Sequence, residues 1–307
     1  MTDGGHDDRS NGSVPCTLCG GKSFHSLQQN IPKFTQGVGP DVFRAVRCMN
    51  CGLGRTEPIL NDAELNTHYR DFGPHRVSDI SEKALLRMRL AARPGLRAHA
   101  LRSLYKARHA PFAPFFGVTG RLLDIGCGSG DFMVRMKNIG WEVAGHDVYS
   151  GAGSLARDHG CRVEIGTVSE LNRVFTEKFD LVTAWHALEH MRQPKEFAQT
   201  ALSLLRRGGC LVIEVPNLDA LERWITGPNW WLWMPPIHLT HWSPQPLRRL
   251  LADAGFDRIR FSTHGSHLAH SLKVMNPYIR HIVSMLAAGT QEVLGRGSNL
   301  RVVAEVP

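Results

Sequence analysis

The sequence has no apolar run approaching the roughly 20 residues that a membrane-spanning helix requires. Its opening, MTDGGHDDRSNGS, is polar and acidic, and it lacks the basic start and apolar middle of a secretory signal peptide. No internal repeat is visible. The seven cysteines are an odd number in a chain without such a signal, which argues against a disulfide framework. These absences predict a cytoplasmic globular protein with a disordered tail over residues 1–13.

Acidic residues are also absent from one long basic segment. Between Lys83 and Arg108 there is no Asp or Glu, and the segment carries a formal charge of +8, equal to that of the whole chain. Its cations are Lys83, Arg87, Arg89, Arg93, Arg97, Arg102, Lys106 and Arg108. Because the remainder is formally neutral, the whole chain is not a generic polyanion binder. We expect this segment either to meet a phosphate or a carrier-protein surface, or to be a solvated helix face.

What is present divides the chain into four regions. We predict a tail over 1–13, a Cys-containing unit over 14–60, a basic helical linker over 61–117 and an α/β domain over 118–307. In the Cys-containing unit, one strand is expected to lead into each pair of cysteines. In the last region we expect a loop over 224–244 and a helical insert over 266–296, which includes an amphipathic stretch near 277–294.

The last region alternates apolar strand patterns with helical ones, which is typical of a doubly wound, mostly parallel sheet. The predicted strands are 121–125, 142–146, 161–165, 179–185 and 210–215, followed by 257–263 and 299–305. The predicted helices are 130–139, 151–159, 168–174, 194–206 and 246–255. The last two strands lack the usual crossover helix between them, which predicts an antiparallel edge on the parallel sheet.

Two Cys pairs near the start have the spacing of a metal site. Cys16 and Cys19 form one C-x2-C knuckle followed by Gly, and Cys48 and Cys51 form the other. Four thiolates with this spacing make a closed tetrahedral zinc site without an open position for substrate. The unit is too small to fold on apolar burial alone, so a structural Zn²⁺ is expected to hold it together.

A glycine-rich turn follows the first predicted strand. The run Leu122–Gly130 reads LLDIGCGSG and places Gly126, Gly128 and Gly130 between a buried strand and a helix. A phosphate-binding loop would need Gly-Lys followed by Ser or Thr, and a dinucleotide fingerprint would need Gly at position 131, which is Asp131. The run resembles the first motif of class I S-adenosylmethionine-dependent methyltransferases, so we expect the turn to bind that cofactor.

Two further segments resemble the same family. Residues 179–190, FDLVTAWHALEH, match a strand-end segment of small-molecule methyltransferases, and residues 204–217 match the family's helix, Gly-Gly turn and strand. The resemblance implies a seven-stranded Rossmann-like sheet. Ligands of doubly wound sheets lie beyond the carboxyl ends of the strands.

The predicted cofactor site lies at that edge. A carboxylate at the end of the second strand, Asp147, can accept the ribose hydroxyls. Trp185 is expected either to face the sulfonium or to be a core aromatic. Asp124 is expected to orient the loop or to reach the cofactor's amino group. The full predicted set is Asp124, Gly126, Cys127, Gly128, Gly130, Asp147, Val148, Thr167, Val168, Trp185 and His186.

The predicted acceptor loop contains four tryptophans and two histidines between Trp230 and Trp242. It is expected either to be a packed lid or to line an acceptor pocket with an imidazole aimed at the acceptor. The stretch resembles a His-Leu-x-His-Phe-Ser-Pro segment of these enzymes. In the zinc-ribbon sugar C-methyltransferases, a His in the place of His238 acts as an acid–base, but the Glu before it is Ile237 here. We predict His238 as the general base, followed by His241 and His186.

The resulting prediction is a methyltransferase that acts on a small-molecule acceptor, such as a secondary metabolite or an activated sugar, which could bear a phosphate or be bound to a carrier. One alternative is a ribosomal or transfer RNA methyltransferase that uses the ribbon and the basic helix. The excess positive charge of this chain is confined to one segment, and no Asn-Pro-Pro-Tyr motif occurs. Nucleic acid is therefore not the favoured partner. Another alternative is an inactive scaffold with the same fold. The amphipathic stretch 277–294 could form a homodimer face.

Overall fold

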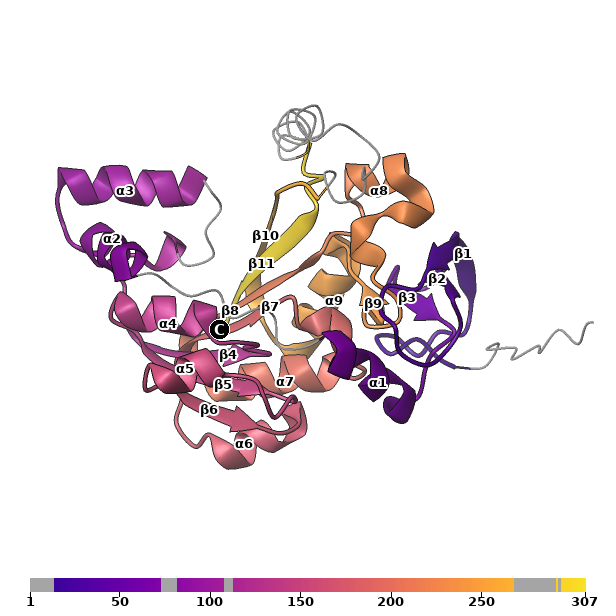
Figure 1. The fold of residues 1–307 in the computed structure, drawn as a ribbon, viewed down its shortest axis with the longest axis horizontal. Helices are drawn as coiled ribbons and strands as arrows, with labels where there is room; N and C mark the ends of the chain where they lie inside the picture. Colours follow the sequence, from indigo (N-terminus) through magenta and orange to yellow (C-terminus); the bar gives the residue numbers. More distant parts are fainter. Residues whose placement is uncertain (1–13, 73–81, 108–112, 268–290, 292–293) are drawn as a thin grey trace, which may run out of the picture.

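The computed structural model describes residues 14–72, 82–107, 113–267, 291 and 294–307 (Figure 1). The predicted tail over 1–13 and nearly all of the predicted insert over 266–296, including its amphipathic stretch, lie outside these residues. Within them, no helix is long and apolar enough to cross a membrane.

The main sheet has seven strands in the order β10-β11-β8-β7-β4-β5-β6. Its five parallel strands are β4 (Arg121–Ile125), β5 (Glu142–Asp147), β6 (Arg162–Ile165), β7 (Phe179–Trp185) and β8 (Leu205–Pro216). β11 (Asn299–Glu305) runs antiparallel to both of its neighbours, β8 and β10 (Asp257–His264). The predicted doubly wound, mostly parallel fold is therefore confirmed, and the antiparallel strand lies one position inside the edge.

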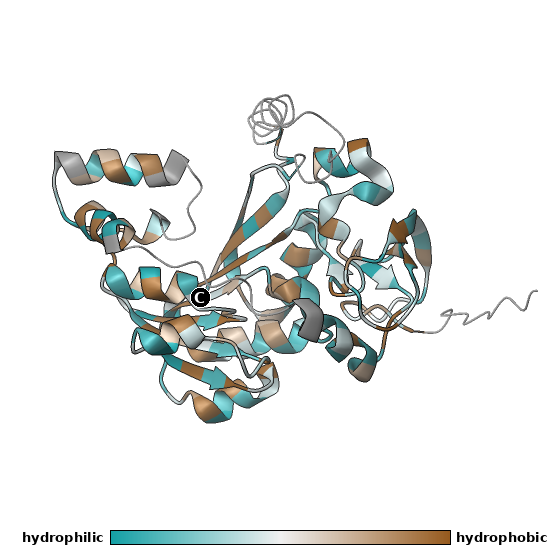
Figure 2. Cartoon of the chain, in the orientation of Figure 1, coloured by the Kyte–Doolittle hydropathy of each residue, from teal (hydrophilic) through white to brown (hydrophobic). Residues whose placement is uncertain are grey.

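Helices cover both faces of this sheet because its strands alternate their apolar side chains. On β4, Leu123 and Ile125 pack in the core formed with α7 (Pro194–Leu204) and α9 (Pro244–Ala254). Leu122 points to the other face and packs with Phe132 and Met136 of α4 (Asp131–Asn138). The helices that cover the sheet alternate apolar and polar residues (Figure 2). The shorter helices are α5 (Ser154–Asp158), α6 (Leu171–Val174) and α8 (Leu221–Thr226).

One predicted helix boundary is wrong. We expected the helix of residues 194–206 to stop at Gly208 and Gly209, but α7 ends at Leu204 and β8 begins at the next residue. Leu205 already pairs with Phe179 of β7, and the Gly208 and Gly209 backbones bond with Val306. These pairings extend the sheet and end the helix early.

The N-terminal ribbon is a four-stranded antiparallel sheet in the order β1-β2-β3-β9. Its strands are β1 (Phe24–Pro32), β2 (Val42–Cys48), β3 (Gly54–Glu57) and β9 (Thr240–His241). β2 leads into the second Cys pair as predicted, but residues 14 and 15 before the first pair are not a strand. The fourth strand comes from the predicted acceptor loop, so that the ribbon and the loop share one sheet.

Between the ribbon and the main sheet, the described residues form three α-helices, namely α1 (Asp62–Phe72), α2 (Glu82–Ala92) and α3 (Leu96–Ala107). α1 lies beside the ribbon, whereas α2 and α3 form a hairpin over α4 at the other end of the molecule (Figure 1). Arg93, Pro94 and Gly95 separate α2 from α3. The Arg102 side chain of α3 donates to the carbonyls of Ala91, Ala92 and Arg93, which caps the end of α2.

Candidate cofactor and acceptor site

The glycine-rich turn links β4 to α4 in a conformation that only glycine adopts without strain. Gly126 and Gly130 have φ angles of 76° and 86°. A Cβ atom on Gly126 would come within 2.5 Å of Ala187, and one on Gly130 within 2.3 Å of Ala156. The turn therefore leaves main chain, rather than side chains, facing the edge of the sheet, which fits the close approach of a ligand.

Asp147 holds this turn from the end of the neighbouring strand. Its carboxylate accepts a hydrogen bond of 2.9 Å from the Gly128 amide and one of 3.0 Å from the Tyr149 amide. The side chain of the next residue, Val148, is 71% exposed. The predicted ribose-binding carboxylate and the glycine turn thus lie together at one edge of the sheet, and their role in cofactor binding stays a prediction.

Asp124 lies in β4, two residues before Gly126 of the turn. It is 2% exposed and accepts a hydrogen bond of 2.7 Å from the Thr183 hydroxyl. Burial raises the pKa of Asp124 to about 7, against the Thr183 hydrogen bond that lowers it. The two roles expected for Asp124, orienting the loop or reaching the cofactor's amino group, both stay predictions. The Cys127 thiol is likewise buried, beside Met133 and Cys161.

Thr167 and Val168 follow β6, where we predicted contact with adenine. The Thr167 amide and hydroxyl bond to the Glu170 carboxylate at 2.7 and 2.9 Å in a capping box. The hydroxyl is therefore engaged in starting the next helical turn. Val168 is half-buried at the same corner of the sheet.

Trp185 ends β7 and packs, half-buried, against the core on the sheet face that α4 covers. Its ring centroid lies 5.1 Å from that of Phe132, and the Arg301 guanidinium lies over the ring at 5.2 Å. This packing favours the core-aromatic interpretation over the sulfonium contact.

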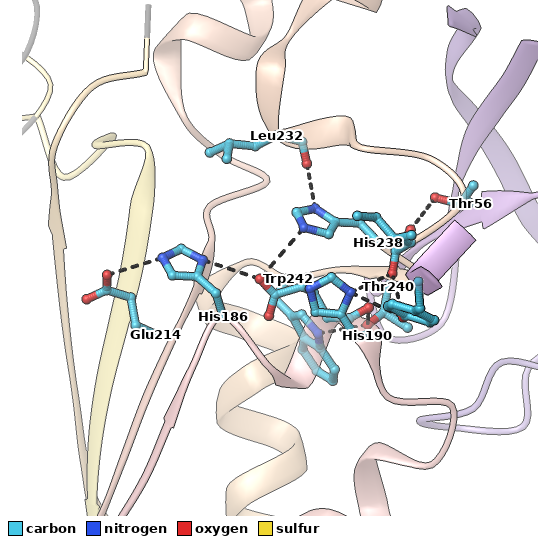
Figure 3. A network of polar contacts seen from close by, with 11 residues as sticks. Thr56, His186, His190, Glu214, Leu232, His238, Thr240 and Trp242 are labelled. Carbon is cyan, nitrogen blue, oxygen red and sulfur yellow. Dashed lines mark hydrogen bonds and ion pairs between the residues drawn. The ribbon is translucent and has the colours of Figure 1, made fainter. Parts of the chain in front are cut away.

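His186 lies between two acidic side chains at the same strand end (Figure 3). Its Nδ1 is 3.3 Å from Glu189 Oε1, its Nε2 is 3.4 Å from Glu214 Oε1, and its side chain remains 42% exposed. Partial removal of the ring from water disfavours the charged imidazolium and lowers its pKa. The two carboxylates have the larger effect and raise the pKa of His186 to about 10. A protonated imidazole cannot accept a proton, so His186 does not fit the role of general base at neutral pH.

Glu189 faces several imidazoles from a fully buried position. Besides His186, its Oε1 lies 4.0 Å from His238 Nε2. Burial favours its protonation, but the surrounding histidines, foremost His186, outweigh this and lower its pKa. One potential metal-ligand atom from each of Glu189, His190 and His238 lies within 4.8 Å of the other two. This group of side chains can therefore hold a proton or a metal ion.

His238 presents one nitrogen to this carboxylate. Its Nδ1 donates a hydrogen bond of 2.8 Å to the Leu232 carbonyl (Figure 3). Nε2 therefore carries the lone pair, and it lies 4.0 Å from Glu189 Oε1. Burial lowers the pKa of His238 to about 3, against the charge of Glu189, which raises it. The ring is therefore neutral at pH 7 and a weak base by itself, and the carboxylate of Glu189 would favour the imidazolium formed when Nε2 accepts a proton. Among the three predicted bases, His238 has the geometry that fits best.

His241 is held instead by the ribbon. The Thr56 hydroxyl donates to the His238 carbonyl at 2.6 Å and lies 3.0 Å from His241 Nε2, which therefore donates to it. Burial lowers the pKa of His241 to about 3. Its Nε2 is thus occupied, and the side chain anchors the loop to β3.

The tryptophans of the acceptor loop are mostly core residues. Trp230, Trp233 and Trp242 are buried, and their indole N–H groups donate to Glu222, Gly227 and Thr240. The packed-lid interpretation therefore holds for most of the loop.

Several site residues escaped the sequence analysis. The Tyr69 hydroxyl of α1 lies 3.4 Å from His190 Nδ1, and that nitrogen lies 2.8 Å from the Ile237 carbonyl. Glu214 of β8 is 2.7 Å from Arg301 of β11. Glu189 and His190 end the segment FDLVTAWHALEH that resembles small-molecule methyltransferases, so the sequence carried a signal for their position. Tyr69 and Arg301 carried none, because nothing in the pattern places α1 or β11 beside the end of β7.

The four predicted zinc ligands lie together. The Cys16 and Cys51 sulfurs are 3.5 Å apart, as are those of Cys19 and Cys48, and all four lie within 4.8 Å of one another. Sulfurs on a tetrahedral zinc ion are separated by about 3.8 Å, given Zn–S bonds of about 2.3 Å. The arrangement fits a zinc site with four thiolate ligands.

Known proteins share this sequence pattern. A family profile described as a methyltransferase domain matches residues 97–260. The ubiquinone biosynthesis O-methyltransferase of Caulobacter vibrioides is 33% identical over 195 residues, which cover 59% of this chain and 69% of that protein. The enzyme of the same name from Caulobacter sp. strain K31 is 33% identical over 200 residues, covering 61% and 71%.

Among solved structures, a SAM-dependent methyltransferase from Archaeoglobus fulgidus aligns with a TM-score of 0.49 and 22% identity, covering 66% of this chain and 94% of that one. The profile match spans more than half of the chain, and the glycine turn, the carboxylate of Asp147 and the strand order agree with it. The chain belongs to the S-adenosylmethionine-dependent methyltransferases.

Proposed function

We propose that this enzyme methylates a hydroxyl oxygen of a small-molecule acceptor bound between the glycine turn and the loop over 224–244. S-adenosylmethionine supplies an activated methyl group, so the protein must align the acceptor, exclude water and accept one proton. The names of the Caulobacter relatives, which are O-methyltransferases, support oxygen as the acceptor atom.

The observation that carries the proposal is the buried carboxylate of Glu189, which faces His186 and His238 at the strand end next to the glycine turn. A hydroxyl must lose its proton as it is methylated, whereas a tertiary amine acceptor needs no base. His238 Nε2 would take that proton, and Glu189 would stabilise the imidazolium. A positioned base of this kind typically contributes about 10²–10⁴-fold to the rate.

His186 would act differently. As a cation held between the two carboxylates of Glu189 and Glu214, it would offset part of their negative charge and hold Glu189 in place beside His238.

The ribbon is proposed to bind a structural Zn²⁺ through Cys16, Cys19, Cys48 and Cys51. The sulfur separations support this, and the amide of Gly21 donates to the Cys19 sulfur at 3.4 Å, as in zinc knuckles. Because β9 belongs to both the ribbon sheet and the acceptor loop, the metal would fix the loop that holds His238.

The proposal is tested by incubating the enzyme with methyl-labelled S-adenosylmethionine and a panel of acceptors matched in size. The panel contains catechols and other phenols, the corresponding anilines, and a deoxy analogue without the hydroxyl. We expect label in the phenolic products and none with the deoxy analogue. Preferential labelling of the anilines, or of carbon in the deoxy analogue, would contradict O-methylation.

A further inference from the structure

The outward face of α2 combines exposed leucines with cations. Leu86 is 57% exposed and Leu90 is 43% exposed, although the helix has an apolar face of its own. That face, with Met88 and Ala91, is fully buried against the main domain. The exposed leucines are therefore additional to those that fold the helix onto α4.

The helical period arranges these side chains in three neighbouring rows. Leu86 and Leu90 form one row at i and i+4. Lys83 and Arg87 form the row on one side, and Arg89 lies on the other side, followed by Arg93 just beyond the helix end. Among the side chains that the structure describes, the leucine row is thus bordered by cations on both sides and lies opposite the buried Met88 row.

The cations have no acidic partner within the part of the chain that the structure describes. Lys83, Arg87 and Arg93 are exposed and form no ion pair there. Arg89 donates to the Asn138 side chain and so keeps its full charge. On α3, Leu104 is a further exposed leucine, at 56%.

We propose that this face of α2, defined by Lys83, Leu86, Arg87, Leu90 and Arg93, docks the enzyme on the surface of an anionic lipid bilayer. A helix lying in a bilayer surface buries an apolar strip among the upper acyl chains, and its flanking Lys and Arg side chains reach the phosphate groups. A row of leucines between two rows of cations meets both requirements on one plane.

Other polyanions fit this face less well. A nucleic acid would use the cations and leave two exposed leucines in contact with water or phosphates. An acidic protein could match both features, but would need an apolar groove aligned between two acidic rows. The proposal rests on α2 alone and does not depend on the proposed reaction.

The test is co-sedimentation of the full chain with phosphatidylcholine vesicles, with and without phosphatidylglycerol. We expect binding only to the anionic vesicles, and loss of binding as salt is raised. Each cation near such a surface contributes about fivefold to the partition coefficient. The double variant Lys83→Gln with Arg87→Gln should therefore lower it on the order of 20-fold.

Two further variants separate the lipid insertion from simple charge. Leu86→Ser with Leu90→Ser keeps every cation and should lower partitioning at least about tenfold, since two leucine side chains no longer enter the bilayer. Val38→Ser with Arg207→Gln, an exposed apolar residue and an exposed cation outside α2, should leave it unchanged. Circular dichroism confirms that each variant is folded.

Three results would overturn the proposal. They are equal binding to neutral vesicles, full binding by the leucine variant, and no vesicle binding at all. Retention on polyglutamate without vesicle binding would instead assign the face to an acidic protein.

Discussion

The Thr56 hydroxyl of the ribbon donates a hydrogen bond of 2.6 Å to the backbone carbonyl of His238. This contact joins β3 to the residue whose imidazole faces Glu189. Because β3 also pairs with β9, the position of His238 depends on the folding of the four-cysteine unit.

Loss of the metal ion from the ribbon should therefore lower the rate of methyl transfer. We expect Cys48→Ser to bind less zinc, measured by atomic emission, and to lower kcat by at least about tenfold as the loop loosens. The affinity for S-adenosylmethionine should change little, because the glycine turn and Asp147 belong to the main sheet. Cys210→Ser, in β8, serves as the control and should keep both its zinc and its kcat.

Replacement of His238 by Ala should lower kcat by about 10²–10⁴-fold, since it removes the nitrogen that is proposed to accept the proton. Calorimetric affinity for S-adenosylmethionine should stay within error of the wild type. His241→Ala removes the hydrogen bond to Thr56, so it should lower the unfolding temperature and have a smaller effect on kcat than His238→Ala. A His238 variant that loses cofactor affinity in proportion to its turnover would contradict the assignment.

Asp147→Asn should act on the cofactor first. A hydrogen bond to a charged group contributes about 1.5–3 kcal/mol, so we expect the Kd for S-adenosylmethionine to rise by about tenfold or more. Glu142→Gln changes an exposed carboxylate at the other end of the same strand and should leave the Kd unchanged. An unaltered Kd in Asp147→Asn would remove this residue from the cofactor site.

The sequence was a good guide to the sheet and to the cofactor edge, for a physical reason. Alternating apolar strands and helices permit few topologies, and the carboxyl ends of parallel strands meet at one edge. Gly126 and Asp147 were placed together on that basis, and the Gly128 amide does bond to Asp147. The cysteine spacing likewise predicted that the four sulfurs would meet.

The acceptor side was harder to predict because it depends on contacts between distant segments. β9 has only two residues and no strand pattern of its own, so its pairing with β3 could not be foreseen. Periodicity did not show that Glu214 would hold His186 as a cation, which removes His186 from the candidate bases. Most of the tryptophans proved to be core side chains, since a dense aromatic run fits a pocket wall and a packed lid equally well.

Asp124 gives a pH dependence with a defined sign. Its pKa is raised to about 7 in the folded protein, against about 3.9 in an unfolded chain, so the folded state holds an extra proton between these values. Stability from this residue is present below pH 4 and is lost as the pH rises to 7, by up to about 4 kcal/mol. The Asn side chain in Asp124→Asn does not titrate, so the variant lacks this pH dependence.

Urea unfolding across this range measures the effect. The stability of Asp124→Asn relative to the wild type should rise from pH 4 to pH 7. A difference that stays constant over this range would show that Asp124 titrates normally. Thr183→Val, which removes the hydrogen bond to the carboxylate, should raise the pKa of Asp124 further and steepen the wild-type trend.

Glu214 should control the charge of His186. Removing its carboxylate in Glu214→Gln leaves only Glu189 to stabilise the imidazolium, so the pKa of His186 should fall from about 10. Stability from His186 is fully present below its unfolded pKa of about 6.5 and is lost as the pH rises through the folded value. The variant should therefore lose more stability near pH 6 than near pH 11. NMR titration of the histidine resonances measures this pKa directly. A His186 resonance that titrates as in the wild type would contradict the proposed role of Glu214. Glu305→Gln, which removes a carboxylate of β11 that pairs with Arg260 instead, is the matched control and should leave that titration unchanged.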